Sequence, residues 1–232
     1  MMRFNILIVL IISFLSWPVQ SLQNDDVYAQ EVDVNNVDWF KYAKLAQVTP
    51  EILYAIALKE SGKYISNVFI PSPFAIGIGV DKSIGQLKHQ SIYPKTRFEA
   101  ETVLADLITK GHTNLGIGMM QVSWIYHNDK VQHPFDLLNV HKNLEVAGAI
   151  LKDCKDRNHS NLSMLSCYSY GEGDDPNGLI YANEAFEYAN TYGTSFVRQL
   201  MPNGPPIGEL NESYLASIWQ AIEANTSLQE TK

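Results

Sequence analysis

The sequence contains little cysteine and an excess of acidic over basic residues. Its 232 residues include 2 cysteines, and 17 Lys+Arg stand against 25 Asp+Glu, for a formal net charge of -8. Two cysteines are too few to build a zinc site alone or a disulfide-dense scaffold. Phosphate binding draws on clustered lysine and arginine, so the acidic balance argues against nucleic acid as the main ligand.

Low-complexity stretches and obvious internal repeats are also lacking, which argues against a disordered or solenoid protein. The chain is 46% hydrophobic and 18% charged. A chain of this length and composition can bury a core, so we expect one domain with short appendages.

An apolar run over residues 4–17 follows a positively charged N-terminus. It is short for a stable membrane span, and Val19 and Ser21 form a small-residue cleavage pattern after it. We therefore predict a secretory signal peptide over residues 1–21 and a flexible N-terminal segment over residues 22–33. A retained membrane anchor is the alternative.

A second acceptable cleavage point follows Ala29. Export leads to an oxidising compartment, here the periplasm, where Cys154 and Cys167 can form a disulfide. In the alternative, Cys154 remains a free cysteine that extends the apolar stripe of its helix. The sequence leaves both readings open, because it gives no distance between the two side chains.

Helical patterns alternate with helix-breaking residues along the chain. Proline and glycine interrupt the region between Asn67 and Lys95, where 74–80 and 91–93 predict short strands of a hairpin or flap. The expected fold class is therefore mainly α, with a small β insertion. Helices are expected over 34–45, from Thr49 to Gly62, and over 97–110, 139–156, 161–170 and 180–192.

The C-terminal part changes character after Gly193. We expect a stiff linker with proline and glycine over residues 194–208 and a helical tail over residues 209–232. The tail is expected to dock on the domain, and binding to another protein is the alternative. Its apolar residues at helical spacing are Leu210, Tyr214, Leu215, Ile218, Trp219 and Ile222.

Glu60 is the first candidate for chemistry. It lies in the last turn of the helix that begins at Thr49-Pro50, between an apolar stretch and Ser61-Gly62. Desolvation there would raise the pKa of its carboxyl group and keep it protonated, as a general acid requires.

Two further segments offer ligand-binding groups. In the segment 114–122, alternate glycines allow close approach of a ligand, and Gln121 offers both a donor and an acceptor. A glycine turn leading into a buried apolar segment is the alternative. Tyr168 and Tyr181 offer stacking faces and phenol groups, although core aromatics would look the same.

Taken in order, four elements resemble the lysozyme-like lytic transglycosylases of the soluble transglycosylase type. They are Glu60-Ser61-Gly62, Gly118-Met119-Met120-Gln121, Tyr168-Ser169-Tyr170-Gly171 and Tyr181. The resemblance covers about Trp39 to Tyr192. The region 71–94 and the run from Gln121 to His127 look closest to transglycosylases of conjugation and type IV secretion systems.

The sequence departs from the family pattern at two positions. Met119 stands where leucine is usual, which conserves volume, and Ser169 stands where asparagine or histidine is usual. Tyr168 and Tyr170 can each be aligned with the motif tyrosine. We favour Tyr168, because that register places Gly171 on the motif glycine.

The resemblance implies a lysozyme-like helical catalytic domain with a small β-hairpin insertion over residues 34–193. Its substrate would be the glycan strands of peptidoglycan, Glu60 would be catalytic, and no metal or organic cofactor would be needed. Partners would be secretion or conjugation proteins, reached through the tail. Substrate-binding residues would be Ser61, Gly118, Met119, Met120, Gln121, Tyr168, Ser169 and Tyr181.

Two other functions remain open at this point. One is a lysozyme-type muramidase, in which water is the acceptor and a second carboxylate assists; Asp81 is the acid that lies in a suitable region of the sequence. The other is a non-catalytic protein that binds the wall and keeps the fold.

Overall fold

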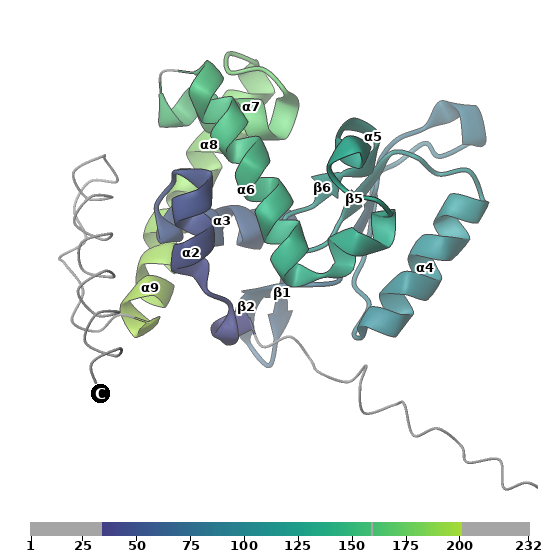
Figure 1. The fold of residues 1–232 in the computed structure, drawn as a ribbon, viewed down its shortest axis with the longest axis horizontal. Coiled ribbons are helices and arrows are strands. Elements are labelled where there is room, and N and C mark those ends of the chain that lie inside the picture. Colours follow the sequence, from purple (N-terminus) through teal and green to yellow (C-terminus); the bar gives the residue numbers. More distant parts are fainter. Residues whose placement is uncertain (1–33, 159, 201–232) are drawn as a thin grey trace, which may run out of the picture.

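The computed structural model describes residues 34–158 and 160–200, which form a mostly helical fold with two small antiparallel sheets (Figure 1). The expectation of a mainly α fold with little β-structure is confirmed. The helices are α2 (Trp39–Ala46), α3 (Pro50–Ser61), α4 (Arg97–Thr109), α5 (Trp124–His127), α6 (Val140–Arg157), α7 (Asn161–Tyr170), α8 (Pro176–Tyr188) and α9 (Thr194–Leu200). Shorter helical turns are η1 (Val34–Asn36), η2 (Lys82–Ile84), η3 (Asn128–Lys130), η4 (Pro134–Leu138) and the π-helical η5 (Ala189–Gly193).

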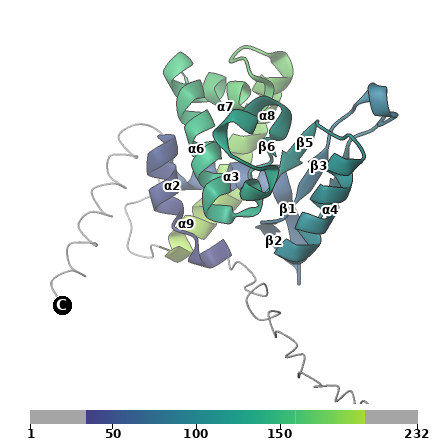
Figure 2. The same ribbon diagram turned by 45° about the vertical axis from the view of Figure 1, so that its right-hand side comes forward.

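Two parts of the fold lie on opposite sides in Figures 1 and 2. Helices α2, α3 and α6 to α9 pack together, while the larger sheet lies beside α4. The chain crosses between the two parts at the end of α3 and again after β6.

Helix α3 is the centre of the helical part. The side chain of Thr49 accepts a hydrogen bond from the Ile52 N–H, and Pro50 occupies the first turn, as expected from the sequence. The helix is buried on nearly all faces, and only Lys59 and Glu60 among its residues remain partly exposed. A helix with such a complete apolar environment holds its last turn in a defined position.

Gly62 ends α3 and begins β1. A Cβ atom at this position would lie 2.2 Å from the Leu58 carbonyl oxygen and 2.4 Å from the Phe69 ring. Glycine is required because the returning strand packs directly against the end of the helix.

The smaller sheet is a hairpin of β1 (Gly62–Ile65) and β2 (Val68–Pro71), turned by Ser66 and Asn67, whose φ angles are 49° and 67°. The larger sheet has the order β4-β3-β5-β6 and is antiparallel throughout. Its strands are β3 (Ile76–Ile78), β4 (Gln90–Ile92), β5 (Leu115–Ile117) and β6 (Val122–Ser123). The predicted strand pair of the insertion is confirmed as β3 and β4, whereas the other pairings were not foreseen.

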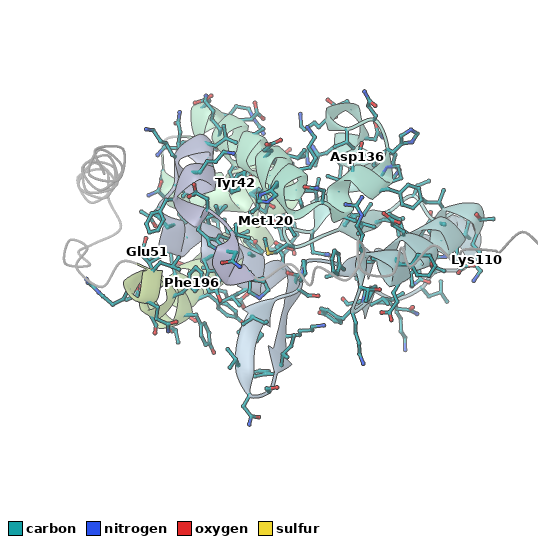
Figure 3. All side chains as sticks on the ribbon, turned by 60° about the horizontal axis from the view of Figure 1, so that its bottom comes forward. Tyr42, Glu51, Lys110, Met120, Asp136 and Phe196 are labelled. Atoms are coloured by element: carbon teal, nitrogen blue, oxygen red, sulfur yellow. A yellow bond between two sulfur atoms is a disulfide. The ribbon has the colours of Figure 1, made fainter. Side chains whose placement is uncertain are left out.

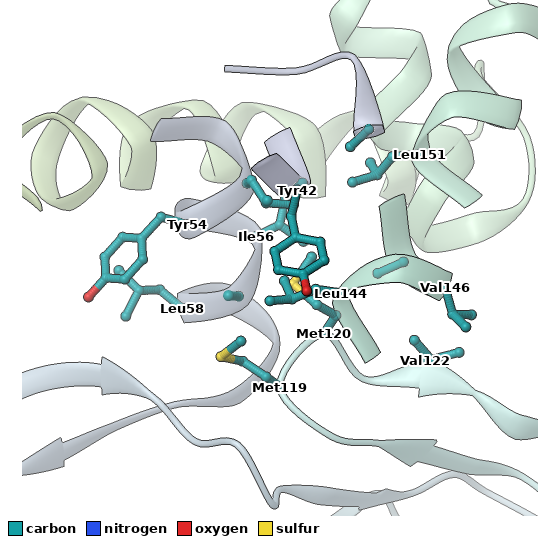
Figure 4. Close-up of a cluster of buried hydrophobic side chains, with 14 of the residues drawn as sticks. Tyr42, Tyr54, Ile56, Leu58, Met119, Met120, Val122, Leu144, Val146 and Leu151 are labelled. Atoms are coloured by element: carbon teal, nitrogen blue, oxygen red, sulfur yellow. The ribbon is translucent and has the colours of Figure 1, made fainter. Parts of the chain in front are cut away.

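The core lies between α3 and the elements around it. Met119 and Met120 reach into it from the β5–β6 turn and are fully buried (Figure 4). Phe196 of α9 closes another side, with its ring stacked on Tyr54 at 3.8 Å and edge-on to Trp39 at 5.8 Å. Figure 3 labels Phe196 close to the stretch of α3 that carries Glu51.

The C-terminal expectation needs a correction. Residues 194–200 form α9, with Phe196 and Val197 buried, so they are not part of a linker. The segment contains no proline or glycine, and its apolar residues pack against α3. The remaining linker residues 201–208, the tail over 209–232, the signal peptide over 1–21 and the segment 22–33 lie outside the described residues.

Helix α8 begins at Pro176, four residues before the expected start at Ile180. The Asp175 carboxylate accepts hydrogen bonds from the backbone N–H groups of Asn177 and Gly178, and Pro176 occupies the first turn. The Asp-Pro pair is an ordinary helix start signal that the sequence reading missed.

Cys154 of α6 and Cys167 of α7 form a disulfide, with 5.7 Å between their Cα atoms. Both residues are also buried, so Cys154 extends the apolar stripe of α6 and is bonded at the same time. Among the described helices, none combines the length and the hydropathy needed to cross a bilayer.

Candidate active site

A cavity of about 440 Å³ lies where the helical part meets the larger sheet, and Glu60 is part of its wall. Its lining comes from six segments that are far apart in the sequence. The lining residues are Glu60, His89, Gln121, Val122, Ser123, His127, Ile150, Tyr168, Ser169, Tyr170 and Tyr181. A larger hollow of about 720 Å³, lined mainly by charged residues from Arg97 to Glu145, contains none of the predicted site residues.

Glu60 has an environment suited to a proton donor. Burial raises the pKa of its carboxyl group to about 7, while a hydrogen bond from Tyr181 and the charge of Lys59 act in the lowering direction. The Tyr181 hydroxyl donates to Oε1 of Glu60 at 2.5 Å. The expectation of a carboxyl group that is protonated near neutral pH is therefore supported, and desolvation is its main cause.

Tyr168 lies on the neighbouring helix α7. Its hydroxyl donates to the backbone carbonyl of Met120 at 2.9 Å, and its pKa is raised well above the usual value by burial and then by the charge of Glu60. Tyr170 also borders the cavity but is 54% exposed. The structure thus places Tyr168 inside the site and Tyr170 at its rim.

Ser169 lies on the cavity wall between the two tyrosines. Its hydroxyl is 3.3 Å from the carbonyl oxygen of Leu165 and 3.2 Å from that of Ser166, both in its own helix. Its polar group is therefore directed toward the helix backbone.

Gln121 lies on the wall opposite, in a left-handed backbone conformation with φ of 46°. Its Nε2 donates to the carbonyl oxygens of Ala75 (3.0 Å) and Gly118 (2.9 Å). Its Oε1 lies against Gly77 and Gly116, which are register partners in β3 and β5. A Cβ atom at these glycines would come within 2.5 Å and 2.8 Å of that oxygen, so both glycines make room for the glutamine.

Four predicted substrate-binding residues do not line the cavity. Met119, Met120 and Ser61 are fully buried, and Gly118 forms the turn beneath them with φ of 80°. The Ser61 hydroxyl is 2.7 Å from the Met119 carbonyl oxygen and accepts a hydrogen bond from the Ser72 N–H. These residues join the end of α3 to the β5–β6 turn, and so hold Glu60 and Gln121 in place.

Asn143 completes this joint and was missed by the sequence reading. It is a fully buried residue of α6; its Oδ1 accepts from the Met120 N–H at 2.8 Å, and its Nδ2 donates to the carbonyls of Ile117 and Leu137. All its side-chain hydrogen-bonding groups are directed at backbone. The available signal was an asparagine on the apolar face of a predicted helix, because such a residue needs internal partners.

Two histidines of the cavity were also missed. His89 precedes β4, and His127 ends α5. Burial, followed by the nearby charge of Lys130, lowers the pKa of His127, so this imidazole is held neutral. His89 lies in no motif, and His127 closes the run from Gln121 to His127 but was given no role there. Only the tertiary fold brings both to the cavity of Glu60.

Glu60 is the one carboxyl group among the described residues that line this cavity. Asp81 lies outside it, where its carboxylate caps η2 and accepts hydrogen bonds from the Ser83 N–H at 3.0 Å and the Ser83 hydroxyl at 2.6 Å. Those bonds lower the pKa of Asp81. The structure therefore does not bring Asp81 to Glu60.

The cavity continues into a second hollow of about 610 Å³ over α5, α6 and α7. The two share six lining residues, so they form one groove that extends from Glu60 past Tyr170 toward the disulfide. Such a groove suits a polymer better than a small compact ligand. Within the described part of the chain, no cluster of three or more His, Cys, Asp or Glu residues could hold a metal ion.

No protein-family model, no curated protein and no solved structure matches this chain.

Proposed function

We propose that this protein is a peptidoglycan lytic transglycosylase with a lysozyme-like catalytic domain. It cleaves the β-1,4 bond between N-acetylmuramic acid and N-acetylglucosamine and forms a 1,6-anhydromuramyl end. The observation that carries the proposal is Glu60, the one carboxyl group among the described residues that line the cavity of about 440 Å³, whose pKa of about 7 lets it act first as an acid and then as a base.

The proposed reaction has two proton transfers at the Glu60 carboxyl group. Glu60 first donates its proton to the glycosidic oxygen of the leaving sugar, and the substrate's own acetamido group stabilises the developing cation. The resulting carboxylate then accepts the proton of the muramyl 6-hydroxyl, whose oxygen closes the anhydro ring. No external water enters the product, and Glu60 returns to its protonated form.

The surroundings of Glu60 fit this cycle. Tyr181 hydrogen-bonds to the carboxyl group and stabilises its ionised form between the two transfers, while burial favours the protonated form that begins the cycle. Tyrosine faces and uncharged polar groups dominate the wall around it, and these suit an uncharged sugar backbone.

An ordinary retaining or inverting glycosidase uses two carboxyl groups about 5–9.5 Å apart. Among the described residues the cavity around Glu60 contains one, Asp81 is engaged elsewhere, and Asp153 in the adjoining hollow is paired with Arg157. This favours the transglycosylase over the muramidase. The other alternative is a wall-binding protein without activity. It does not explain why Glu60, with a pKa near neutrality, is hydrogen-bonded by Tyr181 in the cavity wall.

The proposed biological setting follows from the sequence resemblance. The enzyme would be exported to the periplasm and would open the wall locally for a conjugation or type IV secretion apparatus. Proteins of that apparatus would be its partners, reached through the C-terminal tail over residues 209–232. Substrate contacts would come from Glu60, Gln121, Tyr168, Ser169 and Tyr181.

The test is mass spectrometry of muropeptides released from purified peptidoglycan by the wild type and by Glu60→Gln. The proposal requires 1,6-anhydromuramyl ends from the wild type and a loss of about 10²-fold or more in the variant. Reducing ends would instead identify a muramidase. Absence of cleavage by a folded wild type would identify a wall-binding protein, and full activity in Glu60→Gln would exclude Glu60 as the catalyst.

A further inference from the structure

An ion pair lies directly beside the Glu60 carboxyl group and takes no part in the proposed reaction. The ammonium group of Lys59, the residue before Glu60, forms a salt bridge with Oε2 of Glu184 on α8. The same ammonium lies 4.8 Å from the centre of the Tyr181 ring. The Lys59 side chain is 18% exposed, so it is held in the protein and not extended into solvent.

Four residues on two helices therefore form three contacts between α3 and α8. Lys59 and Glu60 are neighbours in the last turn of α3, and Tyr181 and Glu184 are three residues apart on one face of α8. Glu60 contacts Tyr181, and Lys59 contacts both Tyr181 and Glu184. The tyrosine that binds the catalytic carboxyl group is thus also bound from its ring face.

We propose that Lys59 and Glu184 are positioning residues for Glu60: Lys59 holds Tyr181 in place through its ring, and Glu184 neutralises the ammonium so that the carboxyl group keeps its proton. This inference rests on the proposed function for its kinetic part only. The cation–π contact keeps the tyrosine hydroxyl aimed at Glu60. The carboxylate of Glu184 reduces the net charge that Lys59 presents to Glu60.

Among the described residues, the charged and titratable groups around Glu60 come from five elements or segments. Lys59 comes from α3 itself, Tyr181 and Glu184 from α8, Tyr168 and Tyr170 from α7, His127 from α5 and His89 from the segment before β4. Lys59 lowers the pKa of Glu60, since a nearby positive charge favours the carboxylate. Removing Lys59 must raise that pKa, and removing the negative charge of Glu184 must lower it.

The inference is testable because the two substitutions should shift the pKa of Glu60 in opposite directions. Glu184→Gln keeps the side-chain shape and can still bind Lys59, so it changes the charge alone. Because the Glu184 side chain is 50% exposed, we expect the pKa of Glu60 to fall by only about half a unit in Glu184→Gln. It should rise in Lys59→Met and stay near the wild-type value in Lys59→Arg, which keeps the positive charge. The matched control is Glu187→Gln, which removes the same charge from an exposed position one turn further along α8 and should leave the pKa unchanged.

Two readouts are needed on the full-length protein. The first is the Glu60 titration, followed by NMR of the ¹³C-labelled carboxyl group and assigned with Glu60→Gln, which requires no activity. The second is the pH dependence of anhydromuropeptide release, where the alkaline limb should move with the NMR value. At pH 7 the protonated fraction of Glu60 in Glu184→Gln should fall about twofold, from about one half to about one quarter.

The outcomes distinguish a positioning role of Lys59 and Glu184 from a purely structural one. If the pair were only a structural tie between α3 and α8, Lys59→Met would loosen Tyr181 and raise the pKa of Glu60, whereas Glu184→Gln, which keeps its contact with Lys59, would leave that pKa unchanged. Shifts of the same sign, or none in Glu184→Gln, would overturn the inference. If Lys59→Met fails to fold, Glu184→Gln and Lys59→Arg still decide it. A wild type that titrates as expected but releases no anhydromuropeptide would refute the proposed function and leave the positioning role intact.

Discussion

The hydrogen bond from Tyr181 to Glu60 makes the sharpest prediction about this site. Tyr181→Phe removes the hydroxyl that lies 2.5 Å from Oε1 of Glu60 and keeps the ring that contacts Lys59. The bond acts on Glu60 in the lowering direction, because it stabilises the ionised carboxylate. Its loss must therefore raise the pKa of Glu60 above about 7.

The size of this effect follows from the strength of the bond. A hydrogen bond to a charged group contributes about 1.5–3 kcal/mol, and 1.36 kcal/mol corresponds to one pKa unit. Because Glu60 is partly open to the groove, solvent replaces some of the loss, and we expect a rise of about one unit. At pH 7 Glu60 is then more fully protonated but is a weaker acid, so proton donation to the glycosidic oxygen, which creates the destabilised carboxylate, becomes less favourable.

The assay is the pH–rate profile of Tyr181→Phe on purified peptidoglycan, with NMR titration of the Glu60 carboxyl group beside it. Both should shift to higher pH, and kcat should fall about 10-fold to 10²-fold while KM changes little. Tyr170→Phe, which alters an exposed tyrosine at the rim, is the control. A pKa of Glu60 that falls or stays constant in Tyr181→Phe would refute the reasoning, because the Tyr181 hydroxyl would then not stabilise the ionised carboxylate.

Three further predictions follow from the same structure. Burial raises the folded-state pKa of Glu60 from 4.5 to about 7, so ionisation of this group destabilises the fold as the pH rises through that window. Glu60→Gln should therefore be more stable than the wild type at pH 8, by at most about 3 kcal/mol, and equally stable at pH 4. Thermal unfolding at both pH values is the measurement. Gly77→Ala places a Cβ atom 2.5 Å from Oε1 of Gln121 and should displace that side chain. Activity should fall at least about 10-fold, while circular dichroism shows the helical part intact. Unchanged activity would mean that the position of Gln121 does not matter for the reaction. Asn143→Leu removes the side-chain partners of the Met120 N–H and of two backbone carbonyls. The free energy of unfolding, measured in urea, should fall by about 2–4 kcal/mol. The control Asn183→Leu, at an exposed position of α8, should change it little.

Local signals in the sequence were sufficient for most of the helices. Thr49-Pro50 begins α3 and Ser160 caps α7, which spans the same residues, 161–170, that its pattern predicts. The half-buried state of Glu60 also follows from its place at the end of an apolar helix. These features depend on side chains within a few residues of one another, so the sequence states them directly.

Pairings over long separations could not be derived in this way. The strands β1, β2, β5 and β6 have two to four residues each, too few for an alternating pattern. Residues of the glycine-methionine motif were expected at the substrate because of their order in the chain. Their burial depends on where α6 places Asn143, and no local pattern reports that.

The sequence by itself determined the helical class, the end of α3 and the candidate carboxyl group, since each arises from neighbouring residues. The tertiary structure alone decided the rest: that Cys154 and Cys167 are bonded, that Asp81 lies apart from Glu60, and that Tyr181 binds it. The Glu60–Tyr181 contact joins residues 121 positions apart, and that of Lys59 with Glu184 joins residues 125 apart. Contacts over such separations exist only after packing of the core has brought α3 and α8 together, because no short-range preference of either segment specifies its partner.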